Sequence, residues 1–287
     1  MNVGVLYSRI RRDEKLLLAE LRDRGHGVTK LDVRDQQFGL MDPPVGLGDV
    51  DVLLDRCLAT SRSVHATQFA EAYGVSVVNS AATATRCANK VRTSLALAAA
   101  GVPTPATEVA FTRETALETV ESLGYPCVLK PIVGSWGRLM AKLDSRAAAE
   151  AVLEHKETLG HYEHKIFYLQ EFVDKAGRDI RVLAVDGEPV AAMARRSDHW
   201  LTNAAKGAET ARLTVDDEMR ALVARASEAV GGGLLGVDLM ETDDGYTVHE
   251  VNHTVEFKTL DDTAAVDVPG RVVDWLESRH GPQGVRA

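Results

Sequence analysis

The sequence predicts an α/β protein in which an N-terminal parallel α/β unit is followed by two units of mixed helices and hairpins. Over residues 1–88, short apolar runs alternate with helix-like segments, which is the order of a parallel sheet covered by helices. Residues 89–170 contain helical segments around one short hairpin pattern, and residues 171–280 contain two long hairpin patterns with Asp-Gly turns. Residues 281–287 are expected to form a frayed tail.

The N-terminal unit follows from local patterns. Its strands are predicted at residues 3–7, 28–33, 51–57 and 75–80, and its helices at residues 13–21 and 63–73. Gly25 and Gly74 follow the two helices as stop signals. No G-x-G-x-x-G follows the first strand, so this sheet is not expected to bind a dinucleotide.

The middle and last units also follow from periodicity and turn residues. In the middle unit, helices are predicted at residues 83–100, 112–123 and 145–159, with the strand YPCVLKP, a hairpin partner in LMAKLDS, and a further strand at 166–173. In the last unit, one hairpin turns around Asp186-Gly187 and a second around Asp244-Gly245. Helices are expected up to Val230 and over residues 268–279.

Composition excludes several classes of function. With 45% hydrophobic and 26% charged residues, the chain resembles an ordinary globular protein, and neither a membrane span nor a signal peptide is expected. The three cysteines are widely spaced, which predicts no zinc or dithiol site and is typical of the reducing cytoplasm. A net charge of −9 argues against general nucleic-acid binding, so an anion site must be a local basic cluster.

The segment KPIVGSWGRLMAK, residues 130–142, is the first candidate site. Gly134 and Gly137 allow backbone N–H groups to approach an anion closely, and Lys130 and Arg138 add positive charge. This combination suits a triphosphate under a flap, although a plain hairpin turn with solvent-facing charges would have a similar sequence. The segment does not have the Walker A pattern.

Three oxygen-bearing side chains form the second candidate site. Asp238 lies in the apolar run GVDLM, and Glu250 and Asn252 alternate in VHEVN, so the hairpin between them can bring all three to one face. Two carboxylates and an amide oxygen suit Mg²⁺. Polar pairing on an exposed sheet face is the alternative, and it is disfavoured because an acid in a buried strand needs a partner or a metal.

Two weaker features complete the pattern. The end of the strand in Gln170-Glu-Phe-Val173 can offer edge backbone groups to an adenine ring, though many ordinary strand ends look the same. Arg178, Arg181, Arg195 and Arg196 lie in the following hairpin and are expected to converge with Arg138 on acidic groups, unless they occupy a solvated face. No histidine spacing indicates a metal site.

In their order along the chain, these motifs resemble the ATP-grasp superfamily. Lys90, VLKP, GSWGR, QEFV, GRDIRV, Asp238 and HEVN follow the superfamily layout over nearly the whole chain, and the resemblance is strongest to the RimK-type branch. Within that branch, GSWGRLMAK, HKIFYLQEFV, RRSDHWLTN and HEVNHTVEFK are similar to motifs of the LysX/ArgX ligases, which join an acidic amino acid to the small carrier protein LysW. The implied fold has an N-terminal α/β domain, a central lid domain and a C-terminal domain that binds ATP and metal.

The resemblance implies a role for each matching position. ATP would be bound by Lys90, Lys130, the flap Gly134, Ser135, Trp136, Gly137 and Arg138, the adenine-site residues Gln170, Glu171, Phe172 and Val173, and Asp179 near the ribose. Mg²⁺ would be held by Asp238, Glu250 and Asn252. Arg195 and Asn203 would act at the reacting carboxylate and phosphate, and the amino acid would meet Arg181, Arg195, Glu256, Phe257, Lys258, Thr259 and Leu260.

The implied reaction is the ATP-dependent formation of an amide between the C-terminal glutamate side chain of a LysW-type acidic carrier protein and the α-amino group of 2-aminoadipate or glutamate. An acyl phosphate would be the intermediate, and a homo-oligomeric enzyme is expected. After Glu-Phe-Lys, aminoadipate enzymes of this group have Asn followed by Ser or Thr, and glutamate enzymes have Gly-Phe. Thr259-Leu260 matches neither pair, so the acceptor stays open. A ligase for two free small molecules and a non-catalytic nucleotide-binding protein are the alternatives.

Overall fold

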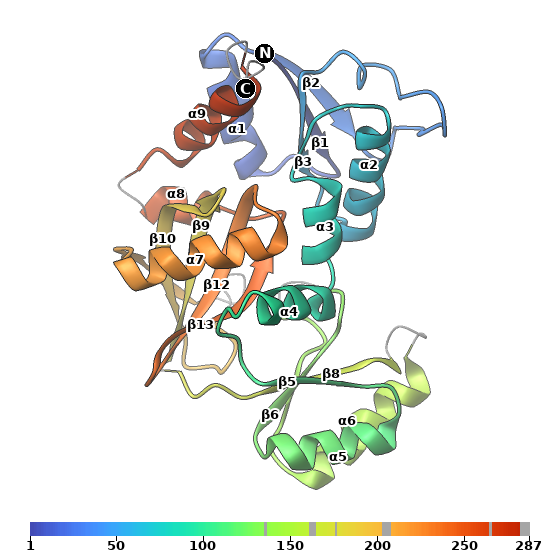
Figure 1. Ribbon diagram of the computed structural model, residues 1–287, viewed down its shortest axis with the longest axis vertical. Coiled ribbons are helices and arrows are strands. Elements are labelled where there is room, and N and C mark those ends of the chain that lie inside the picture. Colours follow the sequence, from blue (N-terminus) through green and yellow to red (C-terminus); the bar gives the residue numbers. More distant parts are fainter. Residues whose placement is uncertain (135–136, 161–164, 176, 203–207, 264–265, 282–287) are drawn as a thin grey trace.

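The computed structural model describes residues 1–134, 137–160, 165–175, 177–202, 208–263 and 266–281. Within these ranges the strands form three sheets, one in each predicted unit. Glu171, the last residue of a strand of the central sheet, lies one position beyond the predicted end of the central unit. The first and third sheets lie close to each other, and the central sheet with its helices lies at the opposite end of the molecule from both termini (Figure 1). The exact domain boundaries stay a prediction.

The N-terminal sheet is parallel throughout, in the order β2-β1-β3-β4, as the strand–helix alternation predicts. Its strands are β1 (Asn2–Tyr7), β2 (Gly27–Asp32), β3 (Val52–Arg56) and β4 (Val77–Val78), and its helices are α1 (Arg12–Asp23), α2 (Thr60–Ala72) and α3 (Ala81–Cys87). Because all strands run the same way, the loops that follow them meet at one edge of the sheet. This edge faces the third sheet.

One predicted helix is divided in two. Instead of one helix over residues 83–100, the chain forms α3 and then α4 (Lys90–Ala99). The side chain of Asn89 accepts hydrogen bonds from the backbone N–H groups of Val91 at 3.0 Å and Arg92 at 3.3 Å, and so caps the second helix. Lys90 is therefore held at the first turn of α4.

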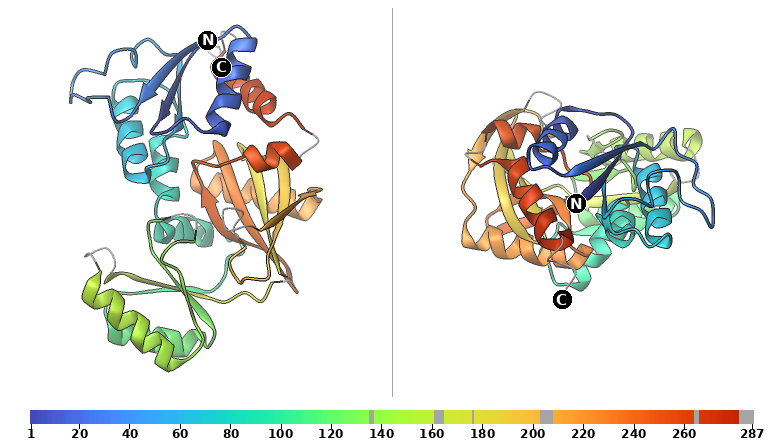
Figure 2. Two further views of the ribbon diagram at one scale, coloured as in Figure 1. Left: turned by 180° about the vertical axis from the view of Figure 1, so that it is seen from behind. Right: turned by 90° about the horizontal axis from the view of Figure 1, so that it is seen from above.

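The central unit is an antiparallel sheet in the order β5-β8-β6-β7, with α5 (Arg113–Leu123) and α6 (Arg146–Leu159) on one face (Figure 2). The strands are β5 (Thr107–Ala110), β6 (Cys127–Lys130), β7 (Ala141–Leu143) and β8 (Phe167–Glu171). The predicted pairing of β6 with β7 is confirmed, and β5 is a strand that the sequence did not predict. Leu129, Phe167 and Leu169 pack with Val120 and Leu153 in a separate core.

The third sheet is antiparallel in the order β11-β10-β9-β12-β13. Its strands are β9 (Arg178–Val185), β10 (Glu188–Arg196), β11 (Glu209–Leu213), β12 (Leu234–Thr242) and β13 (Gly245–Asn252). Asp186 and Gly187 form the first predicted turn with φ of 45° and 84°, which is the left-handed pair that a two-residue hairpin needs. The helix α7 (Asp217–Val230) packs on one face of this sheet.

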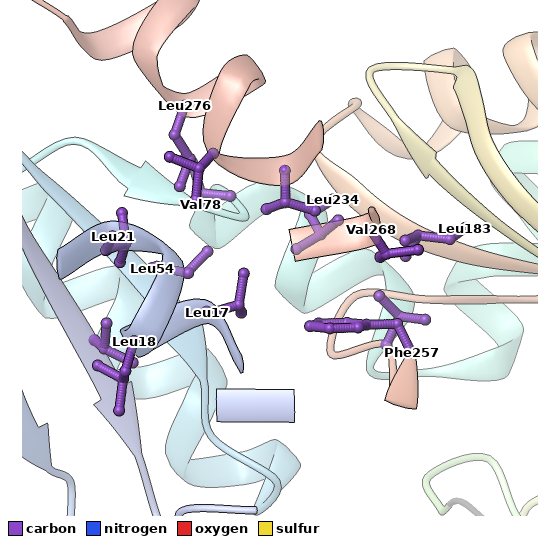
Figure 3. Close-up of a cluster of buried hydrophobic side chains, with 14 of the residues drawn as sticks. Leu17, Leu18, Leu21, Leu54, Val78, Leu183, Leu234, Phe257, Val268 and Leu276 are labelled. Atoms are coloured by element: carbon purple, nitrogen blue, oxygen red, sulfur yellow. The ribbon is translucent and has the colours of Figure 1, made fainter. Parts of the chain in front are cut away.

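The opposite face of the third sheet is divided along its length. At one end, Leu183 and Leu234 pack into a core with Leu17, Leu54 and Val78 of the N-terminal unit (Figure 3). The short helix α8 (Lys258–Thr263) and the last helix α9 (Val268–His280) contribute to the same core. At the other end this face is polar and open. The N-terminal and third sheets are thus joined by one core.

None of the helices in the described ranges is long and apolar enough to cross a membrane.

Candidate active site

A cleft of about 300 Å³ lies where the three units meet. Leu58 and Thr60 line it from the N-terminal unit, Lys90 and Lys130 from the central unit, and the polar face of the third sheet closes it. The predicted site residues that line this cleft are Lys90, Lys130, Gly134, Gly137, Gln170, Glu171, Phe172, Val173, Asp179, Arg181, Arg195, Asp238, Glu250, Asn252, Glu256, Lys258 and Thr259. Arg138 lines a smaller cavity that shares Lys90, Lys130 and Gly134 with the cleft.

Asp238 is the centre of the polar face. On β12 it stands between Arg181 of β9 and Glu250 of β13 in the strand register. Its carboxylate accepts two hydrogen bonds from Arg181, at 2.5 and 2.7 Å, and one from Arg195 at 2.8 Å. Burial alone would raise the pKa of Asp238, but the two arginines outweigh that effect and hold the pKa below its ordinary value. Asp238 is therefore a buried carboxylate that remains ionised.

A β-bulge directs two consecutive residues of β13 into the cleft. Asp238 pairs with Glu250 and Leu239 pairs with Val248, which leaves His249 as the extra residue. As a result, His249 and Glu250 both line the cleft, while Val248 is fully buried on the other face. Glu250 accepts a hydrogen bond from Lys90 Nζ at 2.5 Å, so the first turn of α4 is tied to this strand.

The predicted metal ligands share one wall of the cleft. Asn252 donates through Nδ2 to Asp238 Oδ2 at 3.2 Å, and Glu250 is the cross-strand neighbour of Asp238. Among the described residues, no group of three or more histidine, cysteine, aspartate or glutamate side chains is placed to hold a metal ion. The predicted set consists instead of two carboxylates and an amide, which is a donor set that fits Mg²⁺. Arg181, Arg195 and Lys90 neutralise these carboxylates in the structure as described.

Lys130 is a buried lysine at the end of β6. Its ammonium group donates to Gln170 Oε1 and lies 3.4 Å from both ring nitrogens of His249. Burial, together with the nearby charge of Lys90, lowers the pKa of Lys130 to about 7. Burial and the same lysines lower the pKa of His249 well below its ordinary value, so its ring is neutral and can accept a hydrogen bond.

Aromatic and edge groups form the other end of the cleft. The rings of Phe172 and Trp200 are 6.4 Å apart, and Lys142 Nζ lies 4.6 Å from the centre of the Phe172 ring. Glu171 ends β8, where its N–H donates to Ala106 O and its side chain accepts from Ala106 N, each at 2.9 Å. An apolar face beside a strand end is suited to a flat heteroaromatic ring.

Arg195 joins the two carboxylates of the wall. Its Nε donates to Asp179 Oδ1 at 2.6 Å, and its Nη2 donates to Asp238. Burial would lower the pKa of Arg195, but Asp238 and Asp179 raise it above its ordinary value. Asp179 also accepts a hydrogen bond from Thr202. These bonds fix the guanidinium plane of Arg195 next to the predicted metal ligands.

Several sequence expectations differ from the structure. Phe257 and Leu260, expected to face the amino acid, have fully buried side chains in the core shared by the first and third sheets. The chain alternates between core and cleft up to Phe257, and Leu260 lies on the buried face of the helix α8. Arg178 does not converge on the cleft, since it forms a two-bond ion pair with Glu241 at the strand end. Ser135, Trp136 and Asn203 lie outside the described residues.

The structure also adds residues that the sequence reasoning missed. His249 enters the site only because of the bulge, for which the sequence has no signal. Lys175 follows β8, donates to Thr202 Oγ1 at 2.5 Å and lies 3.7 Å from Asp179. Burial lowers its pKa. This third lysine of the cleft could have been suspected only from its position five residues after Gln170.

Lysine side chains that face a hard-oxygen donor set across one cleft suit a nucleotide-dependent enzyme, and known proteins identify its class as that of the ligases. The LysX preATP-grasp domain family matches residues 3–86, and the RimK-like ATP-grasp domain family matches residues 87–276. The alpha-aminoadipate–LysW ligase LysX of Sulfurisphaera tokodaii is 36% identical over 261 residues, which cover 90% of this chain and 92% of that protein. The glutamate–LysW ligase ArgX of Sulfolobus acidocaldarius is 28% identical over 98% of this chain and 99% of that protein.

A solved structure agrees with the same assignment. The RimK domain ATP-grasp protein of Sphaerobacter thermophilus superposes with a TM-score of 0.81 at 30% identity, over 96% of this chain and 99% of that chain. The chain belongs to the RimK-like ATP-grasp family. Enzymes of this family are ATP-dependent ligases that use Mg²⁺.

Proposed function

We propose that this protein is an ATP- and Mg²⁺-dependent ligase that joins an acidic amino acid to a LysW-type carrier protein. The bond formed is an amide between the side-chain carboxyl of the carrier's C-terminal glutamate and the α-amino group of the amino acid, and the other products are ADP and phosphate. The observation that carries the proposal is one cleft that combines Lys90 and Lys130 with Asp238, Glu250 and Asn252. The similarity to LysW ligases over about nine tenths of the chain supports the choice of partner.

The reaction has two steps. The carrier carboxylate attacks the γ-phosphate of ATP, which breaks the bond to the leaving ADP and forms an acyl phosphate. The amino group of the acceptor then attacks the acyl carbon, and phosphate leaves as the amide forms. The protein needs no nucleophile of its own, because catalysis here consists of positioning and charge stabilisation.

Each residue of the cleft has a proposed task. Lys90 and Lys130 bind phosphate oxygens, Gly134 to Arg138 cover them, and Gln170 to Val173 hold adenine, with Asp179 placed near the ribose. Asp238, Glu250 and Asn252 would hold Mg²⁺, which offsets the negative charge of the phosphates when it is bound. Arg195, with Asn203, stabilises the charge that develops at the reacting carboxyl, where one positioned donor is typically worth about 3 kcal/mol.

The acceptor end of the cleft is the part between Arg181 and the residues after Asn252. Glu256, Lys258 and Thr259 line it, whereas the Leu260 side chain lies in the core. Of the two positions that distinguish aminoadipate from glutamate enzymes, Thr259 is thus the one whose side chain can meet the amino acid. A threonine there leaves both amino acids as candidates.

The test is ligation with purified components. The protein is incubated with ATP, Mg²⁺, a LysW-type carrier, and either 2-aminoadipate or glutamate, and the intact mass of the carrier is measured. We expect the carrier mass to rise by one amino acid residue with one of the two. ADP release from ATP and amino acids without carrier would favour a ligase of free small molecules and contradict the proposal.

We also infer that the enzyme works in the cytoplasm and as a homo-oligomer. Cys57, Cys87 and Cys127 are all free thiols, which suits a reducing compartment. Light scattering coupled to gel filtration measures the mass in solution, and a value near the 31.1 kDa of one chain would contradict the oligomer.

A further inference from the structure

The segment that follows β13, residues 253–258, is a wall of the cleft with two faces. Val255 and Phe257 point inward and are fully buried in the core that joins the first and third sheets. Thr254, Glu256 and Lys258 alternate with them and line the cleft. Whatever fixes the backbone of this segment therefore also fixes three side chains at the acceptor end.

A carboxylate from the N-terminal unit holds the end of this wall. Asp13 lies in the first turn of α1 and is fully buried. Its Oδ1 accepts hydrogen bonds from two consecutive backbone N–H groups, Phe257 at 2.6 Å and Lys258 at 2.9 Å. Figure 3 shows Phe257 beside Leu17, which lies one turn after Asp13 in α1. One carboxylate of the first helix thus holds two backbone groups of the cleft wall.

A buried arginine holds the middle of the wall. Arg56 ends β3 and is fully buried. Its Nη2 donates to Val255 O at 2.9 Å, its Nε donates to Glu14 at 3.2 Å, and its guanidinium lies 5.5 Å from the centre of the Phe257 ring. Arg11, which also pairs with Glu14, donates to the Glu256 side chain at 2.5 Å.

An amide side chain holds the start of the wall. Asn79 follows β4, and its Nδ2 donates to His253 O at 2.6 Å and to Leu234 O at 2.8 Å. Its Oδ1 accepts from Leu234 N at 2.6 Å. One residue therefore joins the first residue of β12 to the end of β13, the two strands that carry Asp238 and Glu250.

We propose that Asp13 and Arg56 are positioning residues, which act through the backbone of residues 253–258 to place the acceptor amino acid. This inference rests on the proposed function, because that function identifies the acceptor amino acid as the molecule that the wall contacts. Buried charges usually stabilise a fold no better than apolar packing of the same volume would, so a network of them is better explained by the geometry it imposes. Asp13 Oδ2 and Arg56 Nη1 are buried without a hydrogen-bond partner in the described structure, which adds to that cost.

The decisive variant is Asp13→Asn, which keeps the size of the side chain and removes its charge. The matched control is Asp186→Asn. Asp186 also joins distant elements, since it accepts hydrogen bonds from Gly233 N and Trp275 Nε1, each at 2.8 Å, but it does not line the cleft. Both variants are first compared by melting temperature, so that general loss of stability is measured separately.

We expect Asp13→Asn to raise KM for the acceptor at least about tenfold while KM for ATP stays within about twofold, because the lysines at the phosphate end come from the central unit. Asp186→Asn should leave the ratio of the two KM values unchanged. An equal rise in both KM values for Asp13→Asn, or no change in either, would overturn the positioning role. If Asp13→Asn does not fold, Arg56→Lys, which keeps the charge at the other positioning residue and shortens its reach to Val255 O, takes its place with a rise of the same kind.

Hydrogen exchange provides a measurement that needs no substrate. Peptides that span residues 253–258 should exchange at least about tenfold faster in Asp13→Asn, and peptides from β6 and β8 should be unchanged. Uniform acceleration across the chain, or none in the wall, would refute the inference. If the wild-type protein does not ligate the carrier at all, the proposed function fails, and the exchange result still decides whether Asp13 positions the wall.

Discussion

Nucleotide binding to this protein should take up protons, because Lys130 is a buried amine with a depressed pKa. Burial lowers the pKa of Lys130 to about 7, so roughly one tenth of the side chains are protonated at pH 8 and roughly half at pH 7. A triphosphate beside the ammonium favours the charged form and returns the pKa toward its ordinary 10.5. Binding should then take up about 0.9 proton at pH 8, about 0.5 at pH 7 and about 0.1 at pH 6.

Isothermal titration calorimetry measures this uptake directly. ADP with Mg²⁺ is titrated into the protein in buffers of different ionisation enthalpy, and the slope of the observed enthalpy against buffer enthalpy gives the number of protons. The terminal phosphate of the nucleotide, with a pKa of about 6, is already ionised at pH 8 and contributes little there.

The pH series and one variant identify the group responsible. The uptake should fall from pH 8 to pH 6, and Lys130→Met should lose most of it at pH 8. A slope near zero for the wild-type protein at pH 8 would refute the reasoning, and so would an equal slope in Lys130→Met.

Three further results are expected. Glu250→Ala should abolish ADP formation with little change in melting temperature, because it removes a proposed Mg²⁺ ligand at the edge of the cleft; full activity at ordinary Mg²⁺ would contradict the assignment. Phe257→Ala should lower the free energy of unfolding by about 3–5 kcal/mol in urea titrations, since it empties a fully buried site in the core between the first and third sheets. A loss below about 1 kcal/mol would mean that this core is not shared. Thr259→Asn should shift the ratio of kcat/KM for 2-aminoadipate over glutamate by about tenfold toward 2-aminoadipate, as one added hydrogen bond would; an unchanged ratio would exclude this position from acceptor selection.

Local sequence was sufficient for the hairpins of the third sheet and for the ends of most helices. Asp186-Gly187 adopts the left-handed backbone pair that the turn requires, and Gly25 and Gly74 follow α1 and α2 closely. By contrast, β5 and β11 were missed, because both lie at sheet edges and are short and partly polar. The break at Asn89 was also missed, since a side chain that caps the next helix looks like any polar residue in an alanine-rich helix.

The candidate site was predictable where it depends on alternation along one strand or on a hairpin between two neighbouring strands. Asp238, Glu250 and Asn252 line one cleft for that reason. His249 could not be predicted, because a one-residue bulge reverses the alternation beside it. Phe257 was assigned to the acceptor because the family resemblance covers the whole segment 256–260, and a resemblance does not show which of its side chains lie in the core.

By itself, the sequence determined the chemistry of this protein: Lys90, a second lysine, Lys130, before a glycine pair, a carboxylate-rich hairpin and an order of motifs that indicates an ATP-grasp ligase. Only the tertiary structure decided how those groups meet. Asp13, Arg56 and Asn79 hold a wall that is roughly 200 residues further along the chain. Their partners are backbone groups, and backbone N–H and C=O groups are the same at every residue, so no residue type in the sequence identifies which ones these side chains bind.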